Sequence, residues 1–192
     1  MNQRGKMTDR AMDVCIRRVA DGDMESLRAL YEELRHPVYR FALSIVGVPE
    51  AAEDVAQEAF LRIRAGARNY VPRGMPRAWI FAIVRNLSIS ERRGLSGHSS
   101  LEEHGELPGA TEPLPEGEAV PDFLDRLTGE EKQIVMLHVL GELRHSEIAS
   151  AMNLPYETVR WKYAYALKKL RTCFTPTGNP LNPREGVVLE EQ

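Results

Sequence analysis

The chain has 192 residues, of which 43% are hydrophobic and 28% charged, a composition typical of a soluble globular protein. No apolar run approaches the roughly 18 residues of a membrane span, and no apolar stretch follows the basic residues at the N-terminus, which argues against a secretory signal. The two cysteines, Cys15 and Cys173, stand near opposite ends. The sequence therefore predicts no disulfide framework and favours a reducing cytosol.

Charge is unevenly distributed, although the net charge is only −3. Residues 61–94 carry eight basic side chains and one acidic side chain, whereas residues 21–60 and 95–127 have net charges of −6 and −7. A basic block between two acidic blocks is typical of a protein that binds nucleic acid with one face and contacts other partners with its remaining surfaces. Chance patterning of a solvated surface explains the charges equally well, so the motifs must decide.

Hydrophobic periodicity predicts that the first half of the chain is helical. Apolar residues recur at helical spacing over 27–45, 52–63 and 79–87. Gly47 is expected to end the first of these helices, and Pro49 suits the first turn of the second. No segment shows the sustained alternation of a β-strand.

A segment without periodicity divides the chain. Residues 94–121 are rich in Gly, Pro, Ser and Glu, which is typical of a linker. The sequence therefore predicts an all-α protein, in which a flexible acidic linker joins two small helical domains. The expected parts are an N-terminal extension (1–20), a helical domain (21–94), a disordered acidic linker (95–121), a second helical domain (122–174) and a disordered tail (175–192).

The second domain has the pattern of a helix-turn-helix. Thr128 and Glu131 form a capping box at the start of its first helix. A short helix at about 146–152, a turn at 153–155 and a longer basic helix at about 156–171 follow. A short helix, a tight turn and a longer basic helix predict a DNA-binding motif.

A helical wheel of the longer helix separates two faces. Val159 lies at the centre of the buried stripe, and Trp161 and Tyr165 fall on the opposite side, bordered by cations. Such cations can neutralise phosphates on both sides of a major groove, while outward side chains reach base edges. An exposed Trp indicates a contact site; packing of Trp161 against the first domain or a partner protein is the alternative. The predicted DNA-reading residues are Tyr156, Glu157, Thr158, Arg160, Trp161, Lys162, Tyr165 and Lys168.

Three segments carry recognisable motifs in a fixed order. They read GVPEAAEDVAQEAF (47–60), PRAWIFAIVRNLSI (76–89) and LRHSEIASAMNLPYETVRWKYAYALKKLR (143–171). They resemble, in turn, the polymerase-binding helix, the −10-recognition helix and the −35-reading helix-turn-helix of the extracytoplasmic-function (ECF) group of RNA polymerase sigma factors. The resemblance spans 21–93 and 123–172.

The resemblance implies a sigma factor, a non-enzymatic subunit that gives RNA polymerase its promoter specificity. Its partners would be core RNA polymerase, through the β and β′ subunits, and the −10 and −35 elements of promoter DNA. Asp54, Gln57 and Glu58 carry the D-x-x-Q-E pattern, share one helix face and are expected to dock on the β′ subunit. The resemblance also implies a bacterial cytoplasmic location and makes an anti-sigma protein a candidate partner.

The basic segment from 66 to 93 is expected to open the −10 element and hold an unstacked base. Flipped bases are held by stacking and by polar contacts over a basic groove. Trp79 lies in an apolar stripe and is expected to be a core anchor rather than a base-stacking residue. The predicted −10-binding residues are Tyr70, Arg73, Arg77, Arg85 and Asn86.

Some positions depart from the family pattern. Trp161 stands where a small polar residue is usual, and Tyr165 and Leu167 stand where arginines are frequent. These differences predict a changed −35 preference. Arg144 replaces the usual serine cap of the short helix, so that helix is expected to begin at Ser146.

A helix-turn-helix regulator that acts without polymerase is the main alternative, but it leaves the acidic docking face and the basic block without a role. An enzyme is not expected, because the chain has no metal-spaced Cys/His set, no Gly-rich phosphate loop and no G-x-S-x-G motif. His138 and His145 are expected to be a helix-surface and a helix-start residue. We expect no cofactor, no metal, no small-molecule substrate and no membrane insertion.

Overall fold

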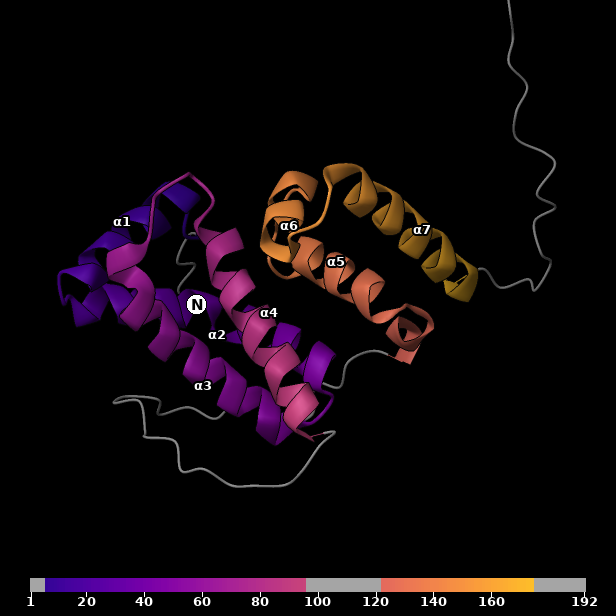
Figure 1. Cartoon of the computed structure of the whole chain (residues 1–192), viewed down its shortest axis with the longest axis horizontal. Helices are drawn as coiled ribbons and strands as arrows, with labels where there is room; N and C mark the ends of the chain where they lie inside the picture. Colours follow the sequence, from indigo (N-terminus) through magenta and orange to yellow (C-terminus); the bar gives the residue numbers. More distant parts are fainter. Residues whose placement is uncertain (1–5, 96–121, 175–192) are drawn as a thin grey trace, which may run out of the picture.

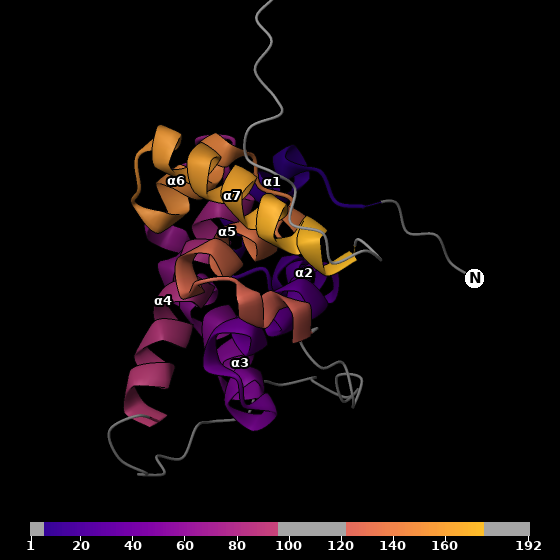
Figure 2. The same ribbon diagram turned by 90° about the vertical axis from the view of Figure 1, so that its right-hand side faces the viewer.

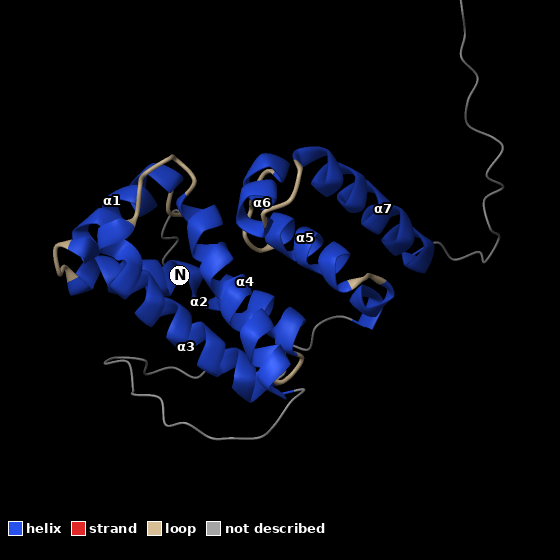
Figure 3. Cartoon of the chain, viewed as in Figure 1, coloured by secondary structure: helices blue, strands red, loops and turns tan. Residues whose placement is uncertain are grey.

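The computed structural model describes residues 6–95 and 122–174, so most of the predicted linker and the predicted tail lie outside the described residues. Within these ranges all regular structure is helical (Figure 3), which confirms the all-α fold class. No helix in these ranges is long and apolar enough to cross a membrane. The elements are α1 (Asp9–Ala20), α2 (Met24–Val46), α3 (Pro49–Gly66), η1 (Ala67–Asn69), α4 (Pro76–Leu95), η2 (Asp122–Arg126), α5 (Gly129–Val139), α6 (His145–Met152) and α7 (Tyr156–Phe174).

Helices α1 to α4 pack around one hydrophobic core and form the N-terminal domain (Figure 1). Phe41, Phe60 and Phe81 come from α2, α3 and α4 and are among its largest fully buried side chains. Gly47 ends α2 in the left-handed conformation with φ of 77°, and Pro49 begins α3, as the sequence predicted. These local signals set the lengths of the helices that carry the candidate sites.

Helix α1 belongs to this domain, although we expected residues 1–20 to be an extension. The Thr8 side chain caps its first turn by accepting a hydrogen bond from the backbone of Ala11. Met12, Ile16 and Val19 lie at i, i+4 and i+7 and are buried in the core. Helix α1 therefore packs on α2, α3 and α4 as part of the same core.

Helices α5, α6 and α7, with η2, form the C-terminal domain. The predicted capping box is confirmed, since Thr128 N–H donates to Glu131 Oε2 at 2.8 Å and the Thr128 hydroxyl accepts from the Glu131 backbone. Helix α6 begins at His145, one residue earlier than predicted. The backbone N–H of Arg144 donates to Glu147 Oε2 at 2.7 Å, and this bond supports the helix start without a serine.

The two domains pack against each other. Helix α5 contacts α2, and α6 contacts α4. Helix α7 lies on the outer side of the C-terminal domain, with α5 between it and the N-terminal domain, and it faces the viewer in Figure 2. The chain therefore carries its predicted DNA-reading helix on an outer surface.

Candidate nucleic-acid interface

Helix α7 presents one buried face and one exposed face. Asn153 ends α6 in the left-handed conformation, with φ of 53°, and this turn directs the chain into α7. Val159 and Ala166 are fully buried and Leu170 is 9% exposed, which confirms the predicted buried stripe. The opposite side of the helix is therefore free to meet another molecule.

Two aromatic side chains stack on the exposed side of α7. Trp161 is 62% exposed and Tyr165 44% exposed, and their rings lie 5.4 Å apart at an interplanar angle of only 5°. The Lys169 Nζ lies 4.8 Å from the centre of the Tyr165 ring, in a cation–π geometry. The stack gives the outer face a flat aromatic surface, because each ring limits the rotation of the other.

Polar and basic residues surround this aromatic stack. The Arg160 side chain is exposed and its Nη1 lies 3.4 Å from Glu157 Oε2, while Lys162 Nζ lies 2.8 Å from Glu130 Oε2 on α5. Lys168 is exposed at the other end of the face. Of the eight predicted DNA-reading residues, Thr158 and Lys162 are half-buried, and the exposed ones are Tyr156, Glu157, Arg160, Trp161, Tyr165 and Lys168.

An ion pair with a buried carboxylate joins α7 to the start of α5. Lys169 Nζ donates to both carboxylate oxygens of Glu131, at 3.0 and 2.7 Å, and the Glu131 side chain is only 5% exposed. Burial acts to raise the pKa of Glu131, but the bonds from Lys169 and Thr128 outweigh burial and hold that pKa below its usual value. Glu131 therefore takes part both in the capping box of α5 and in the ion pair with Lys169 that holds α7 in place.

A cluster of three rings lies where α5, α6 and α7 meet. His138, His145 and Tyr163 have ring centroids 4.7 to 5.5 Å apart, and His138 Nδ1 lies 2.9 Å from the Leu143 carbonyl oxygen. His145 Nε2 is buried and has no hydrogen-bond partner among the described residues. Burial, followed by the nearby His138 and Arg160, lowers the pKa of His145, so the neutral ring is favoured.

The predicted docking residues share one face of α3. Asp54 and Gln57 are exposed, and Glu58 is half-buried. Glu58 Oε1 accepts a hydrogen bond from Arg62 Nε at 2.5 Å, an i, i+4 contact within the helix. The face thus presents a carboxylate, an amide and a partly neutralised carboxylate side by side.

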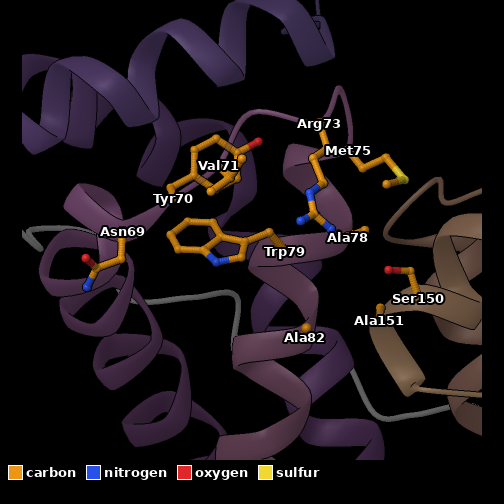
Figure 4. Close-up of a pocket in the computed structure, with 10 residues that line it drawn as sticks. All are labelled: Asn69, Tyr70, Val71, Arg73, Met75, Ala78, Trp79, Ala82, Ser150 and Ala151. Carbon is orange, nitrogen blue, oxygen red and sulfur yellow. The ribbon is translucent and has the colours of Figure 1, made fainter.

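A cavity of about 350 Å³ opens beside the loop between η1 and α4 (Figure 4). Tyr70 and Trp79 form its aromatic wall, with ring centroids 4.7 Å apart and planes inclined by 49°, and the exposed Arg73 also lines it. The Tyr70 hydroxyl donates a hydrogen bond to Asp13 of α1. Burial, then the bond to Asp13, raises the pKa of Tyr70 well above its usual value. An aromatic wall beside a cation can hold a planar base.

Arg77 does not lie where a DNA-contacting residue was expected. Its side chain is only 8% exposed, with Nε 3.4 Å from Asp9 Oδ1 and Nη2 3.5 Å from Glu33 Oε1. Nη2 also donates to the Met7 carbonyl oxygen at 3.2 Å. Two carboxylates and a carbonyl from distant segments hold this guanidinium inside the domain, so Arg77 joins α1, α2 and α4.

The remaining two predicted −10 residues lie further along α4. Asn86 is exposed, whereas Arg85 is half-buried and its Nε donates to Gln133 Oε1 of the C-terminal domain at 2.7 Å. Burial lowers the pKa of Arg85 from its usual value. We refer to Tyr70, Arg73, Arg85 and Asn86 below as the −10 surface.

ECF sigma factors are among the known proteins that resemble this chain, and the similarity extends over most of their length. The chain is 29% identical over 164 residues to the ECF RNA polymerase sigma factor SigL of Mycobacterium tuberculosis. The aligned region covers 79% of this chain and 90% of that protein. It is 24% identical over 173 residues to the ECF sigma factor SigW of Bacillus subtilis, and that aligned region covers 81% of this chain and 92% of SigW.

Two family models match successive parts of the chain. The model of Sigma-70 region 2 matches residues 30–97, and that of Sigma-70 region 4 matches residues 123–172, so together they take up more than half of the sequence. The chain is an ECF sigma factor. The region 2 match contains the predicted docking residues of α3 and the predicted −10 residues, and the region 4 match contains α5, α6 and most of α7.

Solved structures share the fold of this sigma factor. CnrH in complex with the cytosolic domain of CnrY has a TM-score of 0.62 at 16% identity and covers 84% of this chain and 95% of its own. The Bartonella quintana sigma factor RpoE in complex with the anti-sigma factor NepR has a TM-score of 0.55 at 18% identity. The match covers 75% of this chain and 93% of that chain.

Several residues that shape these surfaces in the sigma factor were not predicted from the sequence. Asp13 and Gln133 are polar side chains that approach Tyr70 and Arg85 from other helices. The apolar spacing of α1 could have revealed that Asp13 lies on a packed helix. No comparable signal exists for Gln133, because its contact depends on how the two domains pack.

Proposed function

We propose that this sigma factor binds core RNA polymerase and directs promoter-specific initiation through three surfaces. The α3 face of Asp54, Gln57 and Glu58 would dock on the β′ subunit, the −10 surface would hold the non-template strand, and α7 would read the −35 element. The observation that carries the proposal is the presence of regions 2 and 4 on one chain, with the α3 and α7 faces both exposed.

The reading helix would enter the major groove with its aromatic stack toward the bases. Trp161 and Tyr165 offer mostly apolar ring edges, and the thymine methyl is the apolar group that the major groove presents. Arg160 and Lys168 flank the stack and would contact phosphates, which set position and register rather than sequence. This division makes the stack the specificity determinant and the cations the source of affinity.

The −10 surface would capture an unstacked base of the non-template strand. The cavity beside Tyr70 and Trp79 offers aromatic faces for stacking, and Arg73 supplies a cation for the strand backbone. Arg85 and Asn86 would continue this track along α4. Arg77 is left out of the proposed track, because its guanidinium is buried against Asp9 and Glu33.

The proposed partners follow from these surfaces and from the relatives. Core polymerase would place the protein in the bacterial cytoplasm, beside the chromosome. The two solved structures of similar fold are complexes, one with CnrY and one with the anti-sigma factor NepR. We include an anti-sigma protein among the proposed partners on that ground.

Run-off transcription with core polymerase and fragments of the source genome tests the proposal. Specific transcripts should appear only when the chain is added, and mapping their 5′ ends should reveal a shared pair of elements upstream. Absence of specific transcripts, together with failure of the chain to co-elute with core polymerase, would rule the proposal out. Binding to DNA alone, without binding to polymerase, would instead support a regulator that acts independently.

A further inference from the structure

Residues 70–75 lead from η1 into α4, and we call them the −10 loop. Tyr70 begins this loop, and its backbone N–H donates to the Ala67 carbonyl oxygen at 3.2 Å at the end of η1. No helix or strand spans these six residues, and Gly74 has a positive φ of 68° among them. Loop side chains are more mobile than side chains on helices, so the orientation of the Tyr70 ring depends on its tertiary contacts.

Two contacts from different helices hold the Tyr70 side chain. Its ring lies beside Trp79 of α4, with centroids 4.7 Å apart (Figure 4). Its hydroxyl donates a hydrogen bond to the carboxylate of Asp13 on α1, and bonds to a charged acceptor are stronger than those between neutral groups. Contact with Trp79 alone would allow the Tyr70 ring to turn, whereas the bond at its far end favours one orientation.

Asp13 is a fixed acceptor, because α1 is anchored in the hydrophobic core. Met12 and Ile16 of the same helix are fully buried, and Asp13 is itself only 9% exposed. A buried carboxylate needs a hydrogen-bond partner to offset the cost of its desolvation. The Tyr70 hydroxyl is such a partner, so the bond joins two groups that each depend on the other.

The Tyr70 hydroxyl keeps its proton at neutral and mildly alkaline pH. Burial, then the hydrogen bond to Asp13 and the negative charges of Asp13 and Asp9, raise the pKa of Tyr70 well above its usual value. The phenol therefore remains a donor, and the link between α1 and the −10 loop persists over this pH range.

We propose that Asp13 is a positioning residue for capture of the promoter strand, because it holds the Tyr70 hydroxyl and so fixes the ring as an aromatic wall before DNA arrives. The inference rests on the proposed function of the −10 surface. Asp13 is buried on α1 and acts through Tyr70, without a contact of its own to the strand. Helix α1 thereby contributes to strand capture from outside the −10 surface.

The size of the effect follows from the cost of ordering a side chain. A base that stacks on a ring already held in place does not have to immobilise that ring. Immobilising a free side chain on binding lowers affinity by a factor of about two to twelve. Loss of the Asp13 carboxylate should therefore weaken strand capture by this factor and leave association with core polymerase unchanged.

The test measures base stacking by the reconstituted holoenzyme. The probe is a mixed-sequence single-stranded DNA oligonucleotide with one 2-aminopurine, whose fluorescence falls when the base stacks on an aromatic ring, and the signal with core polymerase alone is subtracted. The variants are Asp13→Ala, Asp13→Asn, Tyr70→Phe and the double variant Asp13→Ala with Tyr70→Phe. Co-elution with core polymerase and circular dichroism establish that each variant assembles and is folded.

Asp9→Ala is the matched control. Asp9 lies one turn before Asp13 on α1, and its carboxylate contacts Arg77 rather than the Tyr70 hydroxyl. Arg77 keeps Glu33 as a partner in this variant. The control therefore removes a carboxylate from the same helix and leaves the bond to Tyr70 in place.

Asp13→Ala and Tyr70→Phe should each weaken stacking by about two- to twelvefold, because each removes one end of the same hydrogen bond. The double variant should be no weaker than the weaker single variant. Asp13→Asn keeps an oxygen acceptor and should retain most of the affinity, and Asp9→Ala should match the parent. In an alkaline absorbance titration, Tyr70 should ionise at lower pH in Asp13→Ala, with Tyr70→Phe identifying its signal.

Equal probe affinity in the parent and in Asp13→Ala would overturn the inference. Additive losses in the double variant would also overturn it, since Asp13 would then act by a route other than Tyr70, and so would an equal loss in Asp9→Ala. A parent holoenzyme that assembles but quenches no probe would instead contradict the proposed role of the −10 surface. Run-off transcription by the parent does not depend on the outcome for Asp13, so the two failures are distinguishable.

Discussion

Replacement of Trp161 by Ala separates a DNA-reading role from a structural one. The ring is 62% exposed and stacks on Tyr165 at 5.4 Å. An aromatic pair contributes about 0.5 to 1.5 kcal/mol, so the free energy of unfolding should fall by no more than about 1.5 kcal/mol. Removal of a side chain that touches a base costs a protein–DNA interface about 1 to 3 kcal/mol, which corresponds to a roughly 5- to 150-fold loss of promoter affinity.

The assay is fluorescence anisotropy of a labelled promoter duplex with the reconstituted holoenzyme, at fixed salt because phosphate contacts are salt-dependent. Association with core polymerase is measured in parallel by co-elution and should be unchanged. Trp161→Phe is the matched control. It keeps an aromatic ring on Tyr165 and an apolar surface toward the groove, so most of the affinity should remain.

Two outcomes would refute the reasoning. Unchanged promoter affinity and unchanged start sites in Trp161→Ala would show that the ring does not contact DNA. Joint loss of promoter binding and polymerase association would assign Trp161 to folding, and a large fall in the melting temperature would accompany that result.

Three further perturbations follow from the described contacts. Asp54→Arg should weaken core-polymerase binding at least about tenfold in a co-elution or anisotropy titration, since charge reversal at a docking contact costs several kcal/mol, while the exposed Asp21→Arg should have no effect. Lys169→Met should lower the free energy of unfolding by about 1 to 3 kcal/mol in urea titrations, because Glu131 remains buried without its partner; an unchanged midpoint would contradict this. The folded-state pKa of His145 is depressed, so its contribution to stability is present above the ordinary value near 6.5 and declines as pH falls below it. Unfolding titrations between about pH 5 and 8 should show this decline, and His145→Gln should reduce it.

Local rules were sufficient to predict the helices of this sigma factor from α2 onward. Gly47 and Pro49 separate α2 from α3, and Thr128 with Glu131 begins α5, because turn and capping residues act on the backbone within a few positions. The exposed face of α7 followed equally well from its periodicity. A period of 3.6 residues that buries Val159 must turn Trp161 outward.

The N-terminal segment has apolar residues at helical spacing, but the charged residues between them make this periodicity less evident. Met12, Ile16 and Val19 have the spacing of a packed helix, and Thr8 precedes them as a cap. The prediction of an N-terminal extension over residues 1–20 did not anticipate that these three side chains lie in the core. Short amphipathic segments at a chain end can therefore be tested by the same spacing as longer ones.

The sequence by itself determined the all-helical fold, the order of the two regions and the outward face of the reading helix, because each depends on residues close together in the chain. Only the tertiary structure decided which arginines of the basic segment are presented to solvent. Arg73 is exposed, Arg77 is buried between Asp9 and Glu33, and Arg85 is bonded to Gln133. The partners of Arg77 and Arg85 come from helices far apart in sequence, and electrostatic attraction acts on distance in space, which a linear pattern of charges does not record.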